Sequence, residues 1–487
     1  MADHTINMVV YDCKKCKKTK KCIFKVPKVL RRQNSEAYTP DVVAIGPFHY
    51  PQKGSKECNI CDECKKHKGR KEREECKEGK EVKEEELELM ERVKKTYLDE
   101  ILRGMNVNLE ELMAKVIEHS DQKNEDTFVK SGRDFYAEPL DHISSKDFME
   151  MMIRDGCFLI QLFRKCKYED LKQDDDPVFN MDCMFHFLCH DLLLLENQLP
   201  WFVLESLYNL ILGNCQGDHS SLSILILDAF TNLPSLKHSC KSYKDHLLKD
   251  QLHRHNCHGD ADVLHILDLI RSSIVVPMEI KDERENKVRK QDFFDPEVHQ
   301  MHTATALSKA GIRFRKVERE SIMDIEFEEG RVLTNGVFNG VLTIPQLNVG
   351  MLSESLFRNL IAIEQCYPGY SNEITSYAIL MDNLISSKED MELLCKAKVI
   401  GNWLSDEDGC KFFNNLYKGI PHNKFYYVDL CEKLNSGYRI RGYTWVASFK
   451  TEKFSNPWTV AAFFIGILLL ALNLWTSTNN IRSFMQK

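Results

Sequence analysis

The sequence lacks the short motifs that mark the most familiar catalytic sites. It contains no Gly-x-Ser-x-Gly nucleophile turn, no Walker-type phosphate loop, no GxGxxG dinucleotide fingerprint and no protein-kinase signature. These absences exclude the serine hydrolases, nucleotide-binding enzymes and kinases that carry such motifs. From the residues alone we therefore expect no catalytic site and no cofactor, and a non-enzymatic protein is the first hypothesis.

The chain also lacks an excess of positive charge and a secretory leader. The 66 Lys and Arg against 73 Asp and Glu give a net charge of -7. This balance argues against nucleic acid as the main partner, because phosphate binding needs a basic face. The only apolar run near the N-terminus, Met8 to Tyr11, is too short for a signal peptide, and no Asn-x-Ser/Thr acceptor occurs. With 18 scattered cysteines, these absences predict a reducing, cytosol-facing compartment and free thiols.

One long stretch lacks charge altogether. No charged residue lies between Lys453 and Arg482, and residues 457–475 read PWTVAAFFIGILLLALNLW. As a helix this stretch spans roughly 28 Å, close to the hydrocarbon thickness of a bilayer. Pro457 begins it, and Trp458 and Trp475 lie near its two ends, where interfacial aromatic residues are common. We expect a transmembrane anchor at about 457–475; the alternative is a buried helix at the end of a globular domain.

The charges on either side of this stretch predict its orientation. The basic residues before it are Arg439, Arg441, Lys450 and Lys453, and those after it are Arg482 and Lys487. The N-terminal excess favours a cytosolic main domain. Twelve residues follow Trp475, so we expect a tail anchor, with a membrane and unknown protein partners as the binding partners.

The remaining chain divides by composition. We expect a flexible basic tail at 1–21, a helical domain at 22–450 and the anchor region at 451–487. Within the domain, residues 51–86 hold eleven acids, eleven bases and no aromatic residue. Such a stretch buries too little apolar surface to offset chain entropy, so we expect a solvated linker or a frayed helix there.

The periodicity of apolar residues predicts a mainly α fold with a minor β-hairpin. The predicted helices cover about 87–104, 145–164, 181–199, 261–274, 354–365, 372–385, 391–403 and 407–417. The predicted strands are 324–327 and 341–344, joined by a Gly- and Asn-rich loop. Residues 181–199 are apolar nearly all round, which is typical of a central helix. Pro200 then breaks or restarts that helix.

Three acids stand in apolar surroundings: Asp155, Asp191 and Glu196. On a continuous helix, Asp191 and Glu196 would be about 140° apart, so they could not form a side-by-side carboxylate pair. Glu196 would lie near the helix C-terminus and need a basic or N–H partner. We therefore expect three structural buried acids. The alternative is an unrecognised, hydrolase-like enzyme that uses these acids or Cys157, although a buried cysteine is usually inert.

Several cysteines and histidines have the spacing of metal ligands. They are Cys13 and Cys16, Cys58, Cys61 and Cys64, the helical set Cys183, His186 and His190, and the set His246, His253, His255, Cys257 and His258. A metal-binding module is therefore a second alternative. We expect no metal site, because the N-terminal cysteines lie in charged sequence without apolar support. The helical set is flanked by Phe185, Phe187 and Leu188, which favours a packed face over a ligand shell.

Strings along the whole chain carry a family resemblance. They include VPKVLRRQNSEAYTPDVVAIGPFHY (26–50), MERVKKTYL (90–98), FMEMMIRDGCFLIQLF (148–163), DLLLLENQLPWFVLESLY (191–208), ATALSKAGIRF (304–314), DIEF (324–327), LTIPQL (342–347), FRNLIAIEQC (357–366), SYAILMDNLISSKEDMELL (376–394) and NPW (456–458). In this order they resemble the plant proteins known as the domain of unknown function 247 family. The resemblance covers the chain from about Cys22 onward.

This resemblance implies a membrane-attached plant protein without an established catalytic activity. Some members of the family are tied genetically to self-incompatibility in grasses, so the resemblance suggests a role in recognition or signalling. We expect an interaction protein with a cytosolic helical domain, no nucleic-acid partner and no small-molecule substrate.

Overall fold

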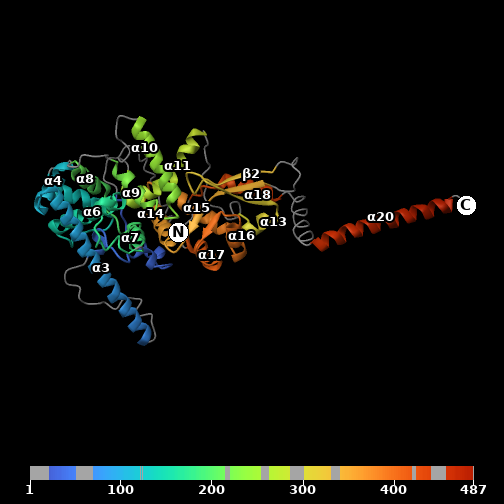
Figure 1. Cartoon of the computed structure of the whole chain (residues 1–487), viewed down its shortest axis with the longest axis horizontal. Helices are drawn as coiled ribbons and strands as arrows, with labels where there is room; N and C mark the ends of the chain where they lie inside the picture. The colour runs from blue at the N-terminus through green and yellow to red at the C-terminus, as the bar shows by residue number, and fades with distance from the viewer. Residues whose placement is uncertain are drawn as a thin grey trace, which may run out of the picture.

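The structure is a computed structural model that describes residues 21–50, 70–120, 122, 124–181, 183–213, 220–253, 263–285, 301–330, 340–418, 420, 424–439 and 457–485. Side chains are described within these ranges except at 70–86, 250–253, 437, 439, 457–460 and 480–485. The predicted mainly α fold with a β-hairpin and one long C-terminal apolar helix is confirmed (Figure 1).

The named elements of the N-terminal half are all helices. Its elements are α1 (Lys28–Arg31), η1 (Glu36–Tyr38), η2 (Pro47–His49), α3 (Arg70–Met105), α4 (Leu109–His119), α5 (Glu125–Asp134), α6 (Ser145–Lys167), η3 (Glu169–Leu171), α7 (Met184–Leu192), α8 (Trp201–Leu212), α9 (Leu222–Phe230), α10 (Lys237–His253) and α11 (Ile266–Arg284). Residues 70–86 of the charged insert belong to α3, in line with the helical alternative for that region. Residues 51–69 lie outside the described residues.

The C-terminal half adds two small sheets. Its elements are α13 (Ala304–Lys309), β1 (Ile312–Val317), β2 (Glu326–Glu329), β3 (Gly340–Pro345), β4 (Leu347–Val349), α14 (Ser353–Cys366), α15 (Glu373–Leu384), α16 (Lys388–Lys396), β5 (Ile400–Asn402), α17 (Asp406–Asn415), α18 (Val428–Arg439) and α20 (Pro457–Met485). In the first sheet β3 pairs in parallel with β1 and antiparallel with β2. In the second sheet β4 and β5 are parallel.

Helix α6 lies at the centre of the N-terminal half and contacts α3, α8 and α9. Ser144 caps its start, because the side chain accepts a hydrogen bond from the backbone of Asp147. Two buried lysines tie it to α3. Lys94 bonds Asp155 at 2.9 Å, and Lys165 bonds Glu100 at 3.0 Å. These pairs cross the helix interface inside the core, so each charge is compensated by a partner on the neighbouring helix.

The predicted central helix at 181–199 is wrong. Helix α7 ends at Leu192, and the chain turns before α8 begins at Trp201. Two side-chain amides explain the early end. The amide of Asn197 donates to the carbonyl of Asp191, and that of Gln198 donates to the carbonyl of Leu192. They satisfy carbonyls that a longer helix would have bonded along its own axis.

Other boundaries also differ from the prediction. Helix α16 ends at Lys396, so the C-terminal part of the predicted helix 391–403 is instead β5. Helix α11 continues past Pro277 to Arg284. Strands β1, β4 and β5 were not predicted, while the predicted hairpin pairing of β2 with β3 is present. The loop within that hairpin, 331–339, lies outside the described residues.

Helix α20 projects away from the helical domain (Figure 1). Its segment Ala461–Asn479 is long and apolar enough to cross a membrane, and none of it is buried against the protein. The helix extends to Met485, further than the predicted end at 475, and Trp475 is 69% exposed.

Gly156 marks the closest approach of α6 to α8. A Cβ added at Gly156 would collide with the Leu207 side chain, whereas one added at Gly104 of α3 would meet open space. We expect Gly156→Ala to lower the free energy of unfolding by about 1–3 kcal/mol through overpacking. The matched control, Gly104→Ala, should raise it by about 0.5–1 kcal/mol through helix propensity. Thermal unfolding of the full chain measures both; an unchanged Gly156 variant would contradict the close packing.

Candidate functional site

Asp191 is fully buried and binds the backbone of the segment that precedes η2. Its carboxylate accepts hydrogen bonds from the N–H groups of Asp41, Val42 and Val43 at 3.0, 2.7 and 2.8 Å. It also bonds the Nδ1 atom of His190 at 2.9 Å. A carboxylate with these partners is compensated in place. This geometry favours a structural role for Asp191, in which its carboxylate holds the backbone of residues 41–43.

Glu196 joins the same turn to a different part of the N-terminal segment. One carboxylate oxygen accepts from the N–H of Val26 and from the guanidinium of Arg31, each at 2.6 Å. The Glu196 side chain is 7% exposed and the Arg31 side chain 30%. Both partners of Glu196 thus lie far earlier in the chain. Glu196 itself lies in the turn between α7 and α8, and not at the end of a helix as predicted.

Asn197 and Gln198 complete this set, and sequence reasoning missed both. Asn197 accepts from the N–H of Ile45 at 2.6 Å, and Gln198 accepts from the N–H of Leu267 in α11 at 3.0 Å. The only signal in the sequence was the position of two amide side chains after Glu196, at the end of a leucine run. Buried amides must find several partners, so they favour a turn that exposes carbonyl groups.

Asp155, the third predicted acid, lies in the same core on α6. It accepts from the N–H of Gly46 at 2.8 Å and from Lys94 at 2.9 Å. Burial raises the pKa of this carboxyl group, and Lys94 opposes that effect. Lys94 also donates to the carbonyl of Ala44. Asp155 thus holds the backbone, as Asp191 does.

The enzyme alternative required two of the candidate side chains to converge in a cavity. Asp155, Glu196 and Cys157 line none of the cavities described below. Cys157 is fully buried on α6, and burial raises the pKa of its thiol to about 12. A thiol so placed is rarely a thiolate at neutral pH. These three residues therefore act as core components in this geometry.

Among the described residues, Cys183, His186 and His190 do not bring their ligand atoms together into one cluster. Cys183 precedes α7 and is exposed, as is His186, whereas His190 is buried. Within the described ranges, the one cluster with close ligand atoms is Asp41, His190 and Asp191. Its central carboxylate, that of Asp191, already accepts backbone hydrogen bonds from residues 41–43.

Of the other metal-ligand candidates, His246 is the one whose side chain the structure describes. His246 bonds Glu320 at 2.8 Å. Cys13, Cys16, Cys58, Cys61, Cys64, His255, Cys257 and His258 lie outside the described residues, and so does the side chain of His253.

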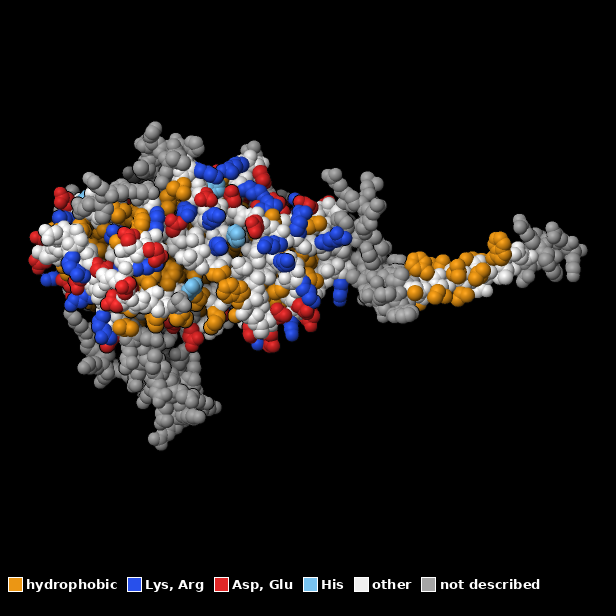
Figure 2. Space-filling view, in the orientation of Figure 1, with side chains coloured by type: hydrophobic (Ala, Val, Ile, Leu, Met, Phe, Trp, Pro, Cys, Tyr) orange, Lys and Arg blue, Asp and Glu red, His pale blue; other side chains and the backbone are white. Residues whose placement is uncertain are grey.

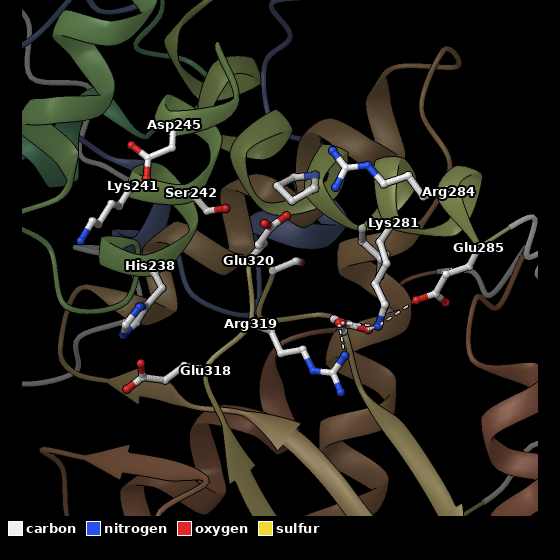
Figure 3. A pocket seen from close by; sticks show the side chains of 14 residues that line it. His238, Lys241, Ser242, Asp245, Lys281, Arg284, Glu285, Glu318, Arg319 and Glu320 are labelled. Carbon is white, nitrogen blue, oxygen red and sulfur yellow. Dashed lines mark hydrogen bonds and ion pairs between the residues drawn. The ribbon is translucent and has the colours of Figure 1, made fainter. Parts of the chain in front are cut away.

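A cavity of about 590 Å³ lies between α10, α11 and the segment before β2. Lys281 bonds Asp324 at 2.9 Å and Glu326 at 2.6 Å, and Arg319 bonds the same two acids at the same distances. Figure 3 shows Lys281 and Arg319 converging on the carboxylate between them. These two cations and two anions balance one another in charge, while Nε of Arg319 is buried without a hydrogen-bond partner.

A smaller cavity, about 270 Å³, has mostly apolar walls. It lies between α7, the segment after α9, and the ends of β4 and β5. Its polar side chains include Asn348 and Ser353, which already bond the Pro234 carbonyl and the Gly350 N–H. Pockets with apolar walls and few polar groups are the usual form of binding sites. This cavity is our candidate functional site.

Two exposed apolar residues form the rim of this cavity. Met351 is 86% exposed and Trp403 is 72% exposed. They follow β4 and β5, whose parallel carboxyl ends meet at this edge, and the N–H of Trp403 bonds the Val349 carbonyl at 3.0 Å. The paired backbone therefore holds both side chains outward. Sequence reasoning missed them, because two three-residue strands give no periodic signal.

His190 is the polar group whose capacity is incomplete in the cavity wall. Its exposure is 8%, and it lines the cavity together with His186 of the same helix. A carboxylate only accepts hydrogen bonds, so the contact with Asp191 requires a proton on Nδ1. In the neutral ring the other nitrogen, Nε2, then carries a lone pair; it bonds no residue in the described part of the chain, and it reaches solvent in the cavity.

Comparison with known proteins gives one family and two relatives. The pattern of the DUF247 family, described as plant protein of unknown function, matches residues 23–472. The UPF0481 protein At3g47200 of Arabidopsis thaliana is 27% identical over 487 aligned residues, which cover 95% of this chain and 87% of that protein. The putative UPF0481 protein At3g02645 of the same plant is 27% identical over 168 residues, 34% of this chain and 30% of that protein. No solved structure matches the chain.

The two acids of the turn should differ in their effect on stability. Asp191→Ala leaves three buried N–H groups without an acceptor, and we expect it to cost about 3–5 kcal/mol. Glu196→Ala leaves one buried N–H, while the part-exposed Arg31 stays hydrated, so we expect about 1–3 kcal/mol. Denaturant unfolding of the full chain, followed by circular dichroism, measures both. The exposed acid Glu110 provides the control variant, and an equal or larger loss for Glu196→Ala would contradict this ranking.

Two buried histidines should make stability depend on pH. Burial lowers the pKa of His265 to about 3 and that of His49 to about 4. The histidines of the unfolded chain bind protons at a higher pH than those of the folded protein. Their contribution to the free energy of unfolding is therefore complete above about pH 6.5, and it is lost as the pH falls toward the pKa values of the folded protein.

The His265 contribution can be isolated. His265 accepts from the Asp268 N–H at the start of α11, at 3.3 Å. We expect His265→Asn, which keeps an acceptor but does not titrate, to flatten the fall in unfolding free energy between pH 7 and 5. Replacing the exposed His119 with Asn is the control. Parallel pH profiles for wild type and His265→Asn would show that His265 is protonated in the folded state.

Proposed function

The chain belongs to the DUF247 family of plant proteins of unknown function, and on this basis we propose that it is a membrane-anchored interaction protein. Helix α20 is the proposed anchor, and the helical domain is proposed to lie in the cytosol and to bind protein partners there.

The observation that carries this proposal is the exposure of α20. All of its described side chains from 461 to 479 face solvent, and they include Leu468, Leu469 and Leu470. Figure 2 shows hydrophobic side chains along this helix, whereas charged side chains of both signs cover much of the visible face of the domain. An uncharged helix of about 28 Å that satisfies its own backbone matches a bilayer core. Water is a poor solvent for such a surface.

The orientation rests on flanking charge. More basic residues precede the anchor than follow it, which supports a cytosolic domain. The many free cysteines of the described part, several of them buried, fit a reducing compartment.

The interaction role rests on how the polar residues are used. The buried acids and Cys157 serve the core, and the candidate cavity has apolar walls with Met351 and Trp403 exposed beside it. Outward aromatic and methionine side chains around a cavity are typical of protein-binding surfaces.

Charge placed in α20 should release the protein from membranes. We expect the double variant Leu468→Arg/Leu472→Arg to move from the carbonate-resistant membrane fraction to the soluble or aggregated fraction, because each central arginine costs about 2.5–3.5 kcal/mol. Fractionation of plant cells that express the full chain measures this. The matched control, Leu468→Ala/Leu472→Ala, should stay with the membrane.

Retention of the arginine variant in carbonate-washed membranes would refute anchoring by α20. The orientation is tested on the wild type by adding protease to sealed microsomes. Digestion of the helical domain is expected, and protection of that domain would place it in the lumen.

A further inference from the structure

We propose that the cavity beside His190 receives a tyrosine side chain from a protein partner. The inference rests on the proposed function, since it assumes that the domain binds proteins, and it names the chemical group that the partner must present.

The size and lining of the cavity indicate that the main part of the ligand group is apolar. Its volume of about 270 Å³ is many times the roughly 10–15 Å³ that a single water needs on the same measure. Its walls are mostly apolar, so filling it with hydrocarbon is favourable. A single phenol ring with its methylene carbon fits this space.

His190 sets the polar end of the ligand group. The bond from Nδ1 to Asp191 leaves Nε2 of the neutral ring as a hydrogen-bond acceptor, and His190 lines the cavity. The residue is more than nine-tenths buried, but Nε2 is not one of the fully buried side-chain atoms without a partner, so solvent in the cavity still reaches it. A group that fills the cavity displaces this solvent and has to supply a donor in its place, or Nε2 loses its hydrogen bond. A hydroxyl group donates to such an atom. Phenylalanine, leucine and methionine fill apolar space but supply no donor, and tyrosine supplies both.

The rim favours a protein over a free small molecule. Met351 and Trp403 extend outward and are largely exposed, so a ligand confined to the cavity would leave most of their surface in water. A polypeptide that inserts one ring would also cover these side chains. This arrangement, a central anchor with an apolar surround, is how binding energy is concentrated at protein interfaces.

The test uses two water-soluble probes that differ by one hydroxyl, N-acetyl-tyrosinamide and N-acetyl-phenylalaninamide. Full-length protein in lipid nanodiscs is titrated with each probe, and saturation-transfer NMR gives the affinity, with empty nanodiscs as blank. We expect the tyrosine probe to bind about fivefold more tightly, the gain of one neutral hydrogen bond. Equal affinities, or no binding of either probe, would overturn the proposal.

Variants locate the binding. His190→Phe should remove the preference for the tyrosine probe, and Ser235→Phe, which fills the cavity from a half-buried position on its wall, should abolish binding of both. Leu248→Ala, at an exposed apolar residue of α10, is the control and should bind as wild type does. Circular dichroism verifies folding, and Ser235→Phe decides the matter if His190→Phe does not fold.

Two further results would overturn the proposal. One is tyrosine-probe binding that persists in folded Ser235→Phe, which would place the site elsewhere. The other is quenching of Trp403 fluorescence by brominated acyl chains, measured as the difference between wild type and Trp403→Phe nanodiscs. That result would show that lipid, and not a protein, covers the rim.

Discussion

The fold depends on how one extended stretch of backbone crosses the core. Residues 41–46 belong to no helix and no strand, yet Val43 and Ile45 are fully buried. Backbone N–H groups in such a place must find acceptors. Asp191 on α7, Asn197 in the turn after α7 and Asp155 on α6 supply them. The three side chains accept the hydrogen bonds that a neighbouring strand would accept in a β-sheet.

This constraint also explains the turn that follows α7. In a helix that continued to residue 199, the carbonyl groups would accept hydrogen bonds within the helix, and successive side chains would point to different sides of it. Instead, Asn197 and Gln198 donate to those carbonyl groups while their oxygens accept from two other segments. Four polar side chains in a short stretch can thus join the N-terminal segment and α11 to α7. An unbroken helix would have to trade these long-range bonds for local ones.

The sequence predicted what depends on local periodicity and missed what depends on distant partners. Helices α6, α14 and α15 lie close to their predicted bounds, because their apolar stripes are long and clearly periodic. The burial of Glu196 was also predictable from its surroundings, but its partners, Val26 and Arg31, lie about 170 residues earlier. Helix α7 and strand β5 are short, and tertiary hydrogen bonds fix their ends. No pattern within a local window carries that information.

The adjacency of Asp191 and His190 connects the core to the candidate site. The carboxylate that holds the buried strand-like segment also fixes the tautomer of the imidazole in the cavity wall. The acceptor in the cavity is therefore set by the same interaction that stabilises the fold, without a separate positioning residue. A surface loop could present a histidine in many orientations, whereas this ring is held by a carboxylate that cannot move without releasing three backbone N–H groups. Such rigidity suits recognition of one defined group, because little conformational entropy is left to lose on binding.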